Sequence, residues 1–387
     1  MKTLEDISLV KYFSEIEDPR EERGKRHNFH AVITMAVCAV LCGANSFEGI
    51  ADYAFCKTNW FKKFFDLPNG SPSADTFIRI FSLIKPEVFE KCFLSWIQSV
   101  KKVWGGETIA IDGKTSRGSY DKQKGFGLLH LVNVYAVNSG LVLLQKKVDE
   151  KTNEINIIPE LLDSLMLKKT VVTIDAMGCQ KKIAEKICDA EADYVLALKA
   201  NQGDFHRGVE EFLDSLISKK IAREFDYAKT EDPNSHGRDE IRECYAVAIT
   251  SKDIKENLFK DIAAWKNLKT IVAVEAKRTL KTTGETSVER RFYISSLDCD
   301  AKEILSRTRE HWGIENSLHY VLDVTFQEDA SRVREKNATQ NFSLIRKVSL
   351  NLIKLFPYKK KRKLNSIAGV RRVAGWSNDF LEELLFN

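Results

Sequence analysis

Two aspartates stand where packing alone gives no reason for a carboxylate. Asp112 follows the strand-forming run ETIAI, and Asp175 follows TVVTI. Aspartate is a poor strand residue and is costly to bury, although either residue could simply open a turn or cap the next helix. We expect each to end a strand. If these strands are parallel neighbours, their carboxyl ends place the two carboxylates side by side.

A third acid, Glu315, lies on or beside the apolar stripe of a long helix predicted over residues 301–324, three residues from Trp312 and from Leu318. A carboxylate against the core side of a helix is unfavourable unless it is paired or binds a metal. His311 and His319, four residues away on either side, could pair with it. The same spacing permits a His-Glu-His zinc site, but no cysteine or further carboxylate motif supports one.

Three carboxylates from two strand ends and a helix make an oxygen-rich site that suits magnesium or manganese. Two such ions about 4 Å apart can activate an attacking water or 3′-hydroxyl and stabilise the leaving oxygen of a phosphodiester. The residues therefore favour metal-dependent phosphodiester chemistry.

The elements around the acids predict how they are positioned. Three strands joined by hairpins are expected from residue 107 to about 148, followed by a helix, a strand at 170–175, a helix at 180–190 and a strand at 193–199. Because parallel strands need a crossover helix between them, this order predicts an α/β fold, a ribonuclease-H-like mixed sheet with helices on both faces.

We divide the chain into five segments. Residues 1–100 read as an all-α domain, 101–200 as the first part of the sheet, 201–297 as a β-rich insertion, 298–340 as the rest of the core with the Glu315 helix, and 341–387 as a basic helical region. In the first segment, Ser73 is an expected N-cap after a turn, and Arg79 lies on an accessible side of the helix that follows. A helix-turn-helix DNA reader and ordinary helix packing both fit this pattern.

Composition bounds the class of protein. The 387 residues include 43% hydrophobic residues, enough for a large core, and 60 Lys and Arg against 55 Asp and Glu. The eight cysteines form no CxxC pair, which is typical of reduced thiols in a cytoplasmic protein. The longest apolar run, residues 31–44, is shorter than the roughly 20 residues that span a bilayer, so we predict no membrane segment.

Basic residues gather near the C-terminus. Residues 341–375 contain ten Lys or Arg and no acidic residue, including the run KKKRK at 359–363. This pattern is typical of a surface that binds the phosphate backbone of DNA, and a solvated tail is the alternative.

With these motifs, the chain resembles the DDE transposases of bacterial insertion sequences, most closely the H-repeat-associated branch. The similar segments are IAIDGKTSRGS, NEINIIPELLDSL, TIDAMGCQKKIAEKI, DYVLALKANQGDF, HGRDEIRE and REHWGIENSLHYVLDVTFQEDASRVR. The resemblance covers nearly the whole chain. It implies a catalytic core in which Asp112, Asp175 and Glu315 hold two Mg or Mn ions.

The resemblance also implies a function. Such a protein cuts double-stranded DNA at the terminal repeats of its element and joins the ends to target DNA, working at least as a dimer on DNA. A DNA-binding remnant without catalysis and a nuclease without strand transfer are the alternatives. Many relatives carry a tyrosine, an arginine and a lysine around the glutamate where this chain has Thr308, His311 and Leu322, so we assign those three positions no role. Asp323 is a possible extra acid near the site.

Basic and amide side chains near the predicted site are candidate DNA contacts. Lys114 and Arg117 follow Asp112 closely enough to neutralise a phosphate, and Lys199 ends a strand beside the acids. A turn cap or a surface loop is the alternative for several of them. The predicted contacts are Arg79, Lys114, Arg117, Lys199, Asn201, Gln202, His236, Arg238, Lys359, Lys360, Lys361, Arg362 and Lys363.

Overall fold

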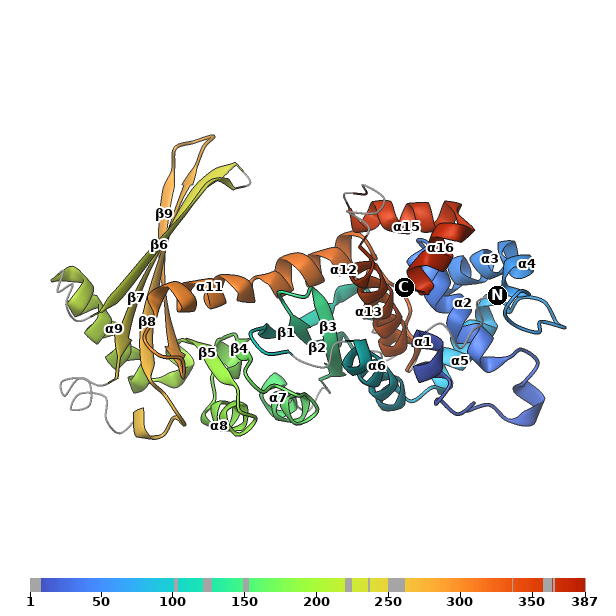
Figure 1. Ribbon diagram of the computed structural model, residues 1–387, viewed down its shortest axis with the longest axis horizontal. Coiled ribbons are helices and arrows are strands. Elements are labelled where there is room, and N and C mark those ends of the chain that lie inside the picture. Colours follow the sequence, from blue (N-terminus) through green and yellow to red (C-terminus); the bar gives the residue numbers. More distant parts are fainter. Residues whose placement is uncertain are drawn as a thin grey trace.

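A computed structural model of the protein describes residues 8–100, 104–120, 127–148, 153–219, 225–235, 237–249, 262–335, 337–357, 364 and 366–386. The molecule is elongated, with a helical unit at one end, a sheet in the middle and long strands at the other end (Figure 1). Across the described residues, no helix combines the length and the apolar character needed to cross a membrane.

Short helices form the first hundred residues, as predicted. The apolar run at 31–44 lies mostly in α2, which is buried along nearly its whole length because apolar residues occupy every side of it. Ser73 caps α5 by accepting a hydrogen bond from the backbone N–H of Thr76 (3.4 Å), which confirms the predicted N-cap. The helices are α1 (Ser8–Phe13), α2 (Phe29–Leu41), α3 (Phe47–Cys56), α4 (Thr58–Phe61), α5 (Ala74–Leu83) and α6 (Pro86–Val100).

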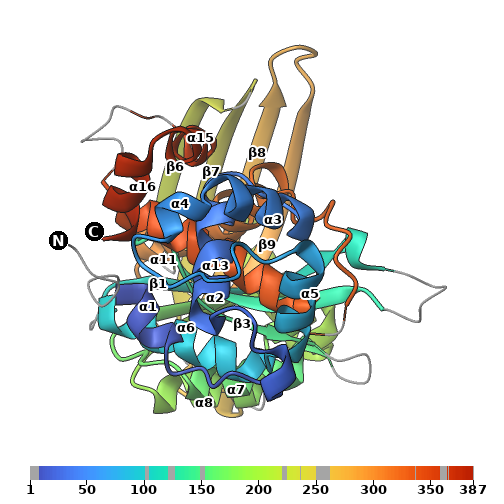
Figure 2. The same cartoon turned by 90° about the vertical axis from the view of Figure 1, so that its right-hand side faces the viewer.

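C-terminal helices complete this unit. Helix α13 (Ala338–Leu355) packs against α2, α5 and α6 and against strand β3 (Leu141–Lys147). Helices α15 (Ile367–Trp376) and α16 (Asn378–Leu385) contact α13 and lie to one side of the helical unit (Figure 2). Three of the ten basic residues of 341–375 are buried here: Arg346, Lys347 and Arg371. The interpretation of the whole segment as a DNA-binding surface is therefore wrong for these three, because burial keeps them from phosphates. The run 359–363 lies outside the described residues.

Nine strands form one mixed sheet in the order β3-β2-β1-β4-β5-β9-β8-β7-β6. The first five strands have the predicted ribonuclease-H-like order, with β1, β4 and β5 parallel and β1, β2 and β3 antiparallel. Helices α7 (Glu154–Asp163) and α8 (Lys181–Asp189) lie on one face, and the long helix crosses the other (Figure 1). This confirms the predicted α/β class. The strands are β1 (Thr108–Ser116), β2 (Leu129–Ala136), β3 (Leu141–Lys147), β4 (Val171–Ile174) and β5 (Asp193–Leu198).

The segment predicted as a β-rich insertion extends this same sheet. After helix α9 (Asp204–Ser218) come β6 (Asp226–Ser235), β7 (Arg238–Ala248), β8 (Thr270–Leu280) and β9 (Thr286–Ser295). Strand β9 pairs antiparallel with β5, so the insertion shares an unbroken hydrogen-bonded ladder with the core. The distal ends of these strands project past the long helix (Figure 1).

The predicted long helix has an irregular turn in its middle. Helix α11 (Ala301–His311) leads into a π-helical turn, η6 (Glu315–His319), and then into α12 (Tyr320–Val324). A π-helical turn inserts one extra residue into a helix and is frequent at functional sites. Here the irregular turn begins at the acid that the sequence singles out.

Candidate active site

Asp112 and Asp175 lie side by side because of strand register. The last residue pair between the parallel strands β1 and β4 is Ile111 with Ile174, so the two aspartates come next at the same level. Asp112 does not end its strand, contrary to our expectation, because β1 stays paired with β2 as far as Ser116. The pairing of β1 with β4 ends just before Asp112, at Ile111 and Ile174. Beyond this point the two strands are no longer paired, and both carboxylates lie where the pairing ends.

The position of Asp175 depends on the loop that follows it. Its Oδ1 accepts hydrogen bonds from the backbone N–H groups of Met177 (3.0 Å) and Gly178 (3.4 Å), which caps the short helix η4 (Ala176–Gly178). Asp175 thus caps this short turn and not the predicted helix that follows, α8, whose N-cap position is Gln180. The same side chain also lines the pocket described below.

Two of the predicted DNA contacts brace this loop. The side-chain amide of Asn201 donates to the Ala176 carbonyl (2.7 Å), and that of Gln202 donates to the Cys179 carbonyl (2.7 Å). Asn201 and Gln202 therefore help to position the loop that carries Asp175. Their contact with DNA stays a prediction.

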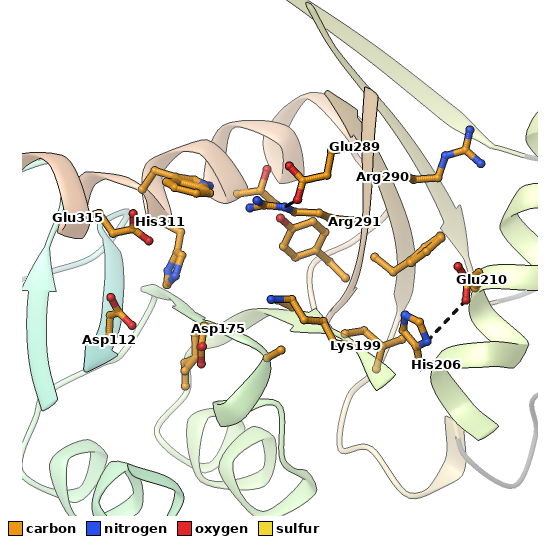
Figure 3. A pocket seen from close by; sticks show the side chains of 18 residues that line it. Asp112, Asp175, Lys199, His206, Glu210, Glu289, Arg290, Arg291, His311 and Glu315 are labelled. Carbon is orange, nitrogen blue, oxygen red and sulfur yellow. Dashed lines mark hydrogen bonds and ion pairs between the residues drawn. The ribbon is translucent and has the colours of Figure 1, made fainter. Parts of the chain in front are cut away.

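Glu315 reaches the two aspartates from the long helix. All three acids line one pocket of about 460 Å³, together with Lys199 and Arg291. Figure 3 shows the side chains of Asp112, Asp175 and Glu315 around that of His311 at one end of this pocket. The tertiary fold thus brings together the three carboxylates that the sequence separates by up to about two hundred residues.

The neighbouring histidines are neutral and have partners other than Glu315. His311 Nδ1 lies 3.0 Å from Thr173 Oγ1, and burial lowers the pKa of His311 to about 4. Burial likewise lowers the pKa of His319 to about 3. Its Nε2 accepts from the Asn133 amide (3.4 Å), so the proton of the neutral ring is on Nδ1, which faces Asp112 Oδ2 at 3.6 Å. Within the described part of the chain neither ring forms an ion pair with Glu315, so the pairing that the sequence offered for this acid does not form.

Repulsion between carboxylates marks the pocket electrostatically. Burial, together with the charges of Asp175, Glu154 and Glu315, raises the pKa of Asp112 to about 7. The pKa of Glu315 is also raised by burial, an effect that the positive charge of Arg291 opposes. A bound cation would relieve this repulsion.

The donor set fits a hard divalent cation. Among the described residues no three His, Cys, Asp or Glu side chains already surround a common point as metal ligands do. This open arrangement suits Mg²⁺ or Mn²⁺, because these ions keep several waters and take other ligands from substrate phosphates. The three carboxylates offer oxygen ligands only.

Glu154, the first residue of α7, is a fourth acid that sequence reasoning missed. Its Oε1 lies 2.6 Å from His130 Nε2, and His130 Nδ1 lies 2.7 Å from Thr115 Oγ1. A Cβ atom on Gly113 would come within 2.0 Å of Glu154 Oε1, so only glycine lets this carboxylate lie against β1. The signal was the glycine directly after Asp112, in a strand where glycine is otherwise unfavourable.

Lys114 is structural, which corrects its predicted contact with phosphate. Its side chain is buried, and its ammonium lies 2.7 Å from Asp323 Oδ1 and 3.3 Å from Glu328 Oε2. Asp323, predicted as an extra acid near the site, is therefore occupied by this pair. Arg117 is exposed; its backbone N–H donates to Asp329 Oδ1 (2.7 Å), and its Nε lies 4.0 Å from Asp329 Oδ2.

The other predicted contacts are spread over the molecule. Lys199 is exposed and lines the pocket of the three acids. Arg238 lies elsewhere, in a groove of about 830 Å³ between the insertion and the long helix. Arg79 is exposed on α5, far along the molecule in the helical unit (Figure 1). His236 lies outside the described residues.

The sequence profile described as "Transposase DDE domain" matches residues 104–352, which include the sheet, the insertion and the long helix. The profile "DDE_Tnp_1-associated" matches residues 10–97. The chain belongs to the DDE transposase family. Members of this family generally use divalent metals, and membership suggests that the protein binds DNA.

Two relatives illustrate the similarity. The chain is 43% identical over 349 residues to "Putative transposase YncI" of Escherichia coli O157:H7, covering 90% of this chain and 87% of that protein. It is 36% identical over 365 residues to "H repeat-associated putative transposase YhhI" of Escherichia coli K12, covering 93% and 94%. These relatives agree with the H-repeat-associated resemblance.

Proposed function

We propose that this protein cuts DNA at the ends of an insertion sequence and transfers the freed 3′ ends into target DNA. The observation that carries the proposal is the convergence of Asp112, Asp175 and Glu315 on one pocket, each from a different element of the core. The family membership supports the same chemistry. We assign these three acids as the catalytic, metal-binding residues.

Each acid would hold a divalent ion with oxygens that the fold already presents. The pKa of Asp112 is raised by its burial and by three nearby carboxylates, so its ionised form would be stabilised by a bound cation. The bound ions, two in our proposal, would supply Lewis-acid activation of the attacking hydroxyl and charge stabilisation on the leaving oxygen.

The surrounding residues orient these ligands. The hydrogen bond from the backbone N–H of Met177 and the amide of Asn201 fix the loop that carries Asp175. The contact with Thr173 holds the His311 ring between the long helix and the sheet. His319, neutral and fixed by Asn133, faces Asp112 without adding positive charge. The two histidines therefore position the acids without adding a positive charge that would repel a bound metal ion.

DNA and a second copy of the chain are the proposed partners. The ends of the element must be brought together for transfer, which requires at least a dimer on DNA. Exposed Arg79 and Arg117 remain proposed DNA contacts, together with the run 359–363 and His236 and Arg238 of the insertion.

The test uses the full chain and a duplex carrying the DNA that borders its gene. With magnesium or manganese, we expect both hydrolysis products and strand-transfer products, resolved on a denaturing gel. Asp112→Asn, Asp175→Asn and Glu315→Gln should each abolish both while the protein stays folded. Cleavage without strand transfer would favour a nuclease of the same fold, and binding without cleavage would favour a catalytically decayed remnant.

A further inference from the structure

The pocket of the three acids has a basic side, of which the sequence predicted Lys199 but not Arg291. Lys199 follows β5 and Arg291 belongs to β9, and these two strands pair antiparallel up to Leu198 with Phe292. The next pair in this register is Lys199 with Arg291. Residues opposite each other in an antiparallel pair project from the same face of the sheet. Both line the pocket, so two cations stand together beside Asp175.

Arg291 is held in a fixed orientation. Its Nε donates to Glu289 Oε1 (2.7 Å), and its guanidinium carbon lies 5.0 Å from the centre of the Trp312 ring, in a cation–π contact. Glu289 also accepts from Arg278 (2.9 Å), which pairs with Glu240 as well, so Arg291 shares its carboxylate with a second guanidinium group. A stacked guanidinium keeps N–H groups at its edge for an oxyanion.

Lys199 complements it. Its side chain is exposed, and in the described part of the chain its ammonium forms no ion pair or hydrogen bond. In Figure 3 it extends into the pocket from the side opposite His311. The ammonium of Lys199 and the guanidinium of Arg291 could therefore both donate hydrogen bonds to one bound oxyanion.

The long helix provides no such charge. Its residues in the pocket are Thr308, His311, Trp312 and Glu315, and His311 is neutral because burial lowers its pKa to about 4. The long helix therefore provides no positive charge to offset the repulsion between the three acids and the phosphates of DNA. The cations on β5 and β9 are the compensation that the pocket itself contains.

We propose, building on the proposed DNA-cutting function, that Lys199 and Arg291 clamp one backbone phosphate of the strand that is cut at the three acids. The clamp would hold a phosphate next to the scissile one, since the two cations and the acids share one pocket. The insertion would thus contribute Arg291, a residue of β9, to the active site. This role would be separate from any DNA contact farther along its strands.

The test measures DNA binding apart from cleavage. Fluorescence anisotropy with the same gene-bordering duplex, in calcium and over a salt series, compares the full-length wild type with Lys199→Gln, Arg291→Gln and the double variant. Each single change is expected to weaken binding about tenfold at low salt and to flatten the slope of log affinity against log salt by about one. Arg291→Lys should restore the slope but only part of the affinity.

A matched control and a chemical probe sharpen the result. Arg290 is the adjacent residue and also lines the pocket, but its guanidinium pairs with Asp214 (2.5 Å) and Glu275 (2.5 Å). Because both carboxylates compensate its charge, Arg290→Gln should leave the salt slope unchanged. Uncharged methylphosphonate linkages, introduced one at a time, should reveal one position near the cut that weakens wild-type binding and has no effect in the double variant.

The outcomes separate the two proposals. If the wild type binds and cuts DNA while Lys199→Gln and Arg291→Gln keep the wild-type slope and the same methylphosphonate sensitivity, the clamp is wrong and the proposed function stands. An Arg290→Gln variant as impaired as Arg291→Gln would also overturn the clamp, because it would indicate general damage to β9. A folded wild type that binds no DNA would overturn both.

Discussion

Replacing Asp112 with asparagine should stabilise the protein when no metal is present. The folded environment raises the pKa of Asp112 from its usual 3.8 to about 7, first through burial and then through the charges of Asp175, Glu154 and Glu315. The folded state therefore prefers the protonated carboxyl. Wild-type stability should fall as pH rises from about 4 to above 7, and the penalty should be fully present at pH 8.

The expected size follows from that pKa. A change from 3.8 to about 7 corresponds to roughly 4 kcal/mol at 1.36 kcal/mol per pKa unit, and relaxation of the partly accessible pocket makes this an upper bound. Asparagine has nearly the same shape and no charge. Asp112→Asn should therefore exceed the wild type in unfolding free energy by up to about 4 kcal/mol at pH 8, and the difference should vanish near pH 4.

Urea unfolding followed by tryptophan fluorescence, in EDTA from pH 4 to pH 8, measures this difference. Glu285→Gln, a change at an exposed acid between β8 and β9, serves as the control and should show no such trend. Magnesium should stabilise the wild type and not Asp112→Asn, because a ligand stabilises only the form that binds it. An Asp112→Asn variant that is less stable than the wild type at every pH would refute the electrostatic account of the pocket.

Three further predictions concern other parts of the molecule. Gly113→Ala should lower the unfolding free energy by about 1–3 kcal/mol, because the new methyl group must displace the Glu154 carboxylate; an unchanged urea midpoint would contradict this. Glu328→Gln should cost about 3–5 kcal/mol at pH 7, since it leaves buried Lys347 without its carboxylate. Because nearby cations lower the pKa of Glu328 to about 2, that difference should shrink in urea titrations as pH falls from about 4.5 toward 2. Arg79→Ala should weaken binding to the element's own ends by roughly 1–3 kcal/mol and spare scrambled duplexes, and equal losses on both would remove the helix-turn-helix proposal.

Local sequence patterns were sufficient for the order of elements and for the three acids. The alternation of strand and helix patterns between residues 107 and 199 predicted a ribonuclease-H-like mixed sheet, because parallel neighbours require a crossover helix. Asp112, Asp175 and Glu315 stood out because a carboxylate conflicts with the apolar pattern around it. Ser73 was recognised as an N-cap from its position before a helical pattern.

Only the tertiary structure decided which charges are buried and which share a pocket. Lys347 reads as part of a basic surface, but α13 lies inside the helical unit, where Glu328 compensates its charge. Arg291 belongs to an insertion that the sequence separates from the core, and it reaches Glu315 because β9 pairs with β5. Burial and pairing depend on partners that are distant along the chain, whereas strand and helix patterns depend on neighbours. The sequence alone therefore determined the elements and the three acids, and the packing of distant segments determined the surroundings in which those acids lie.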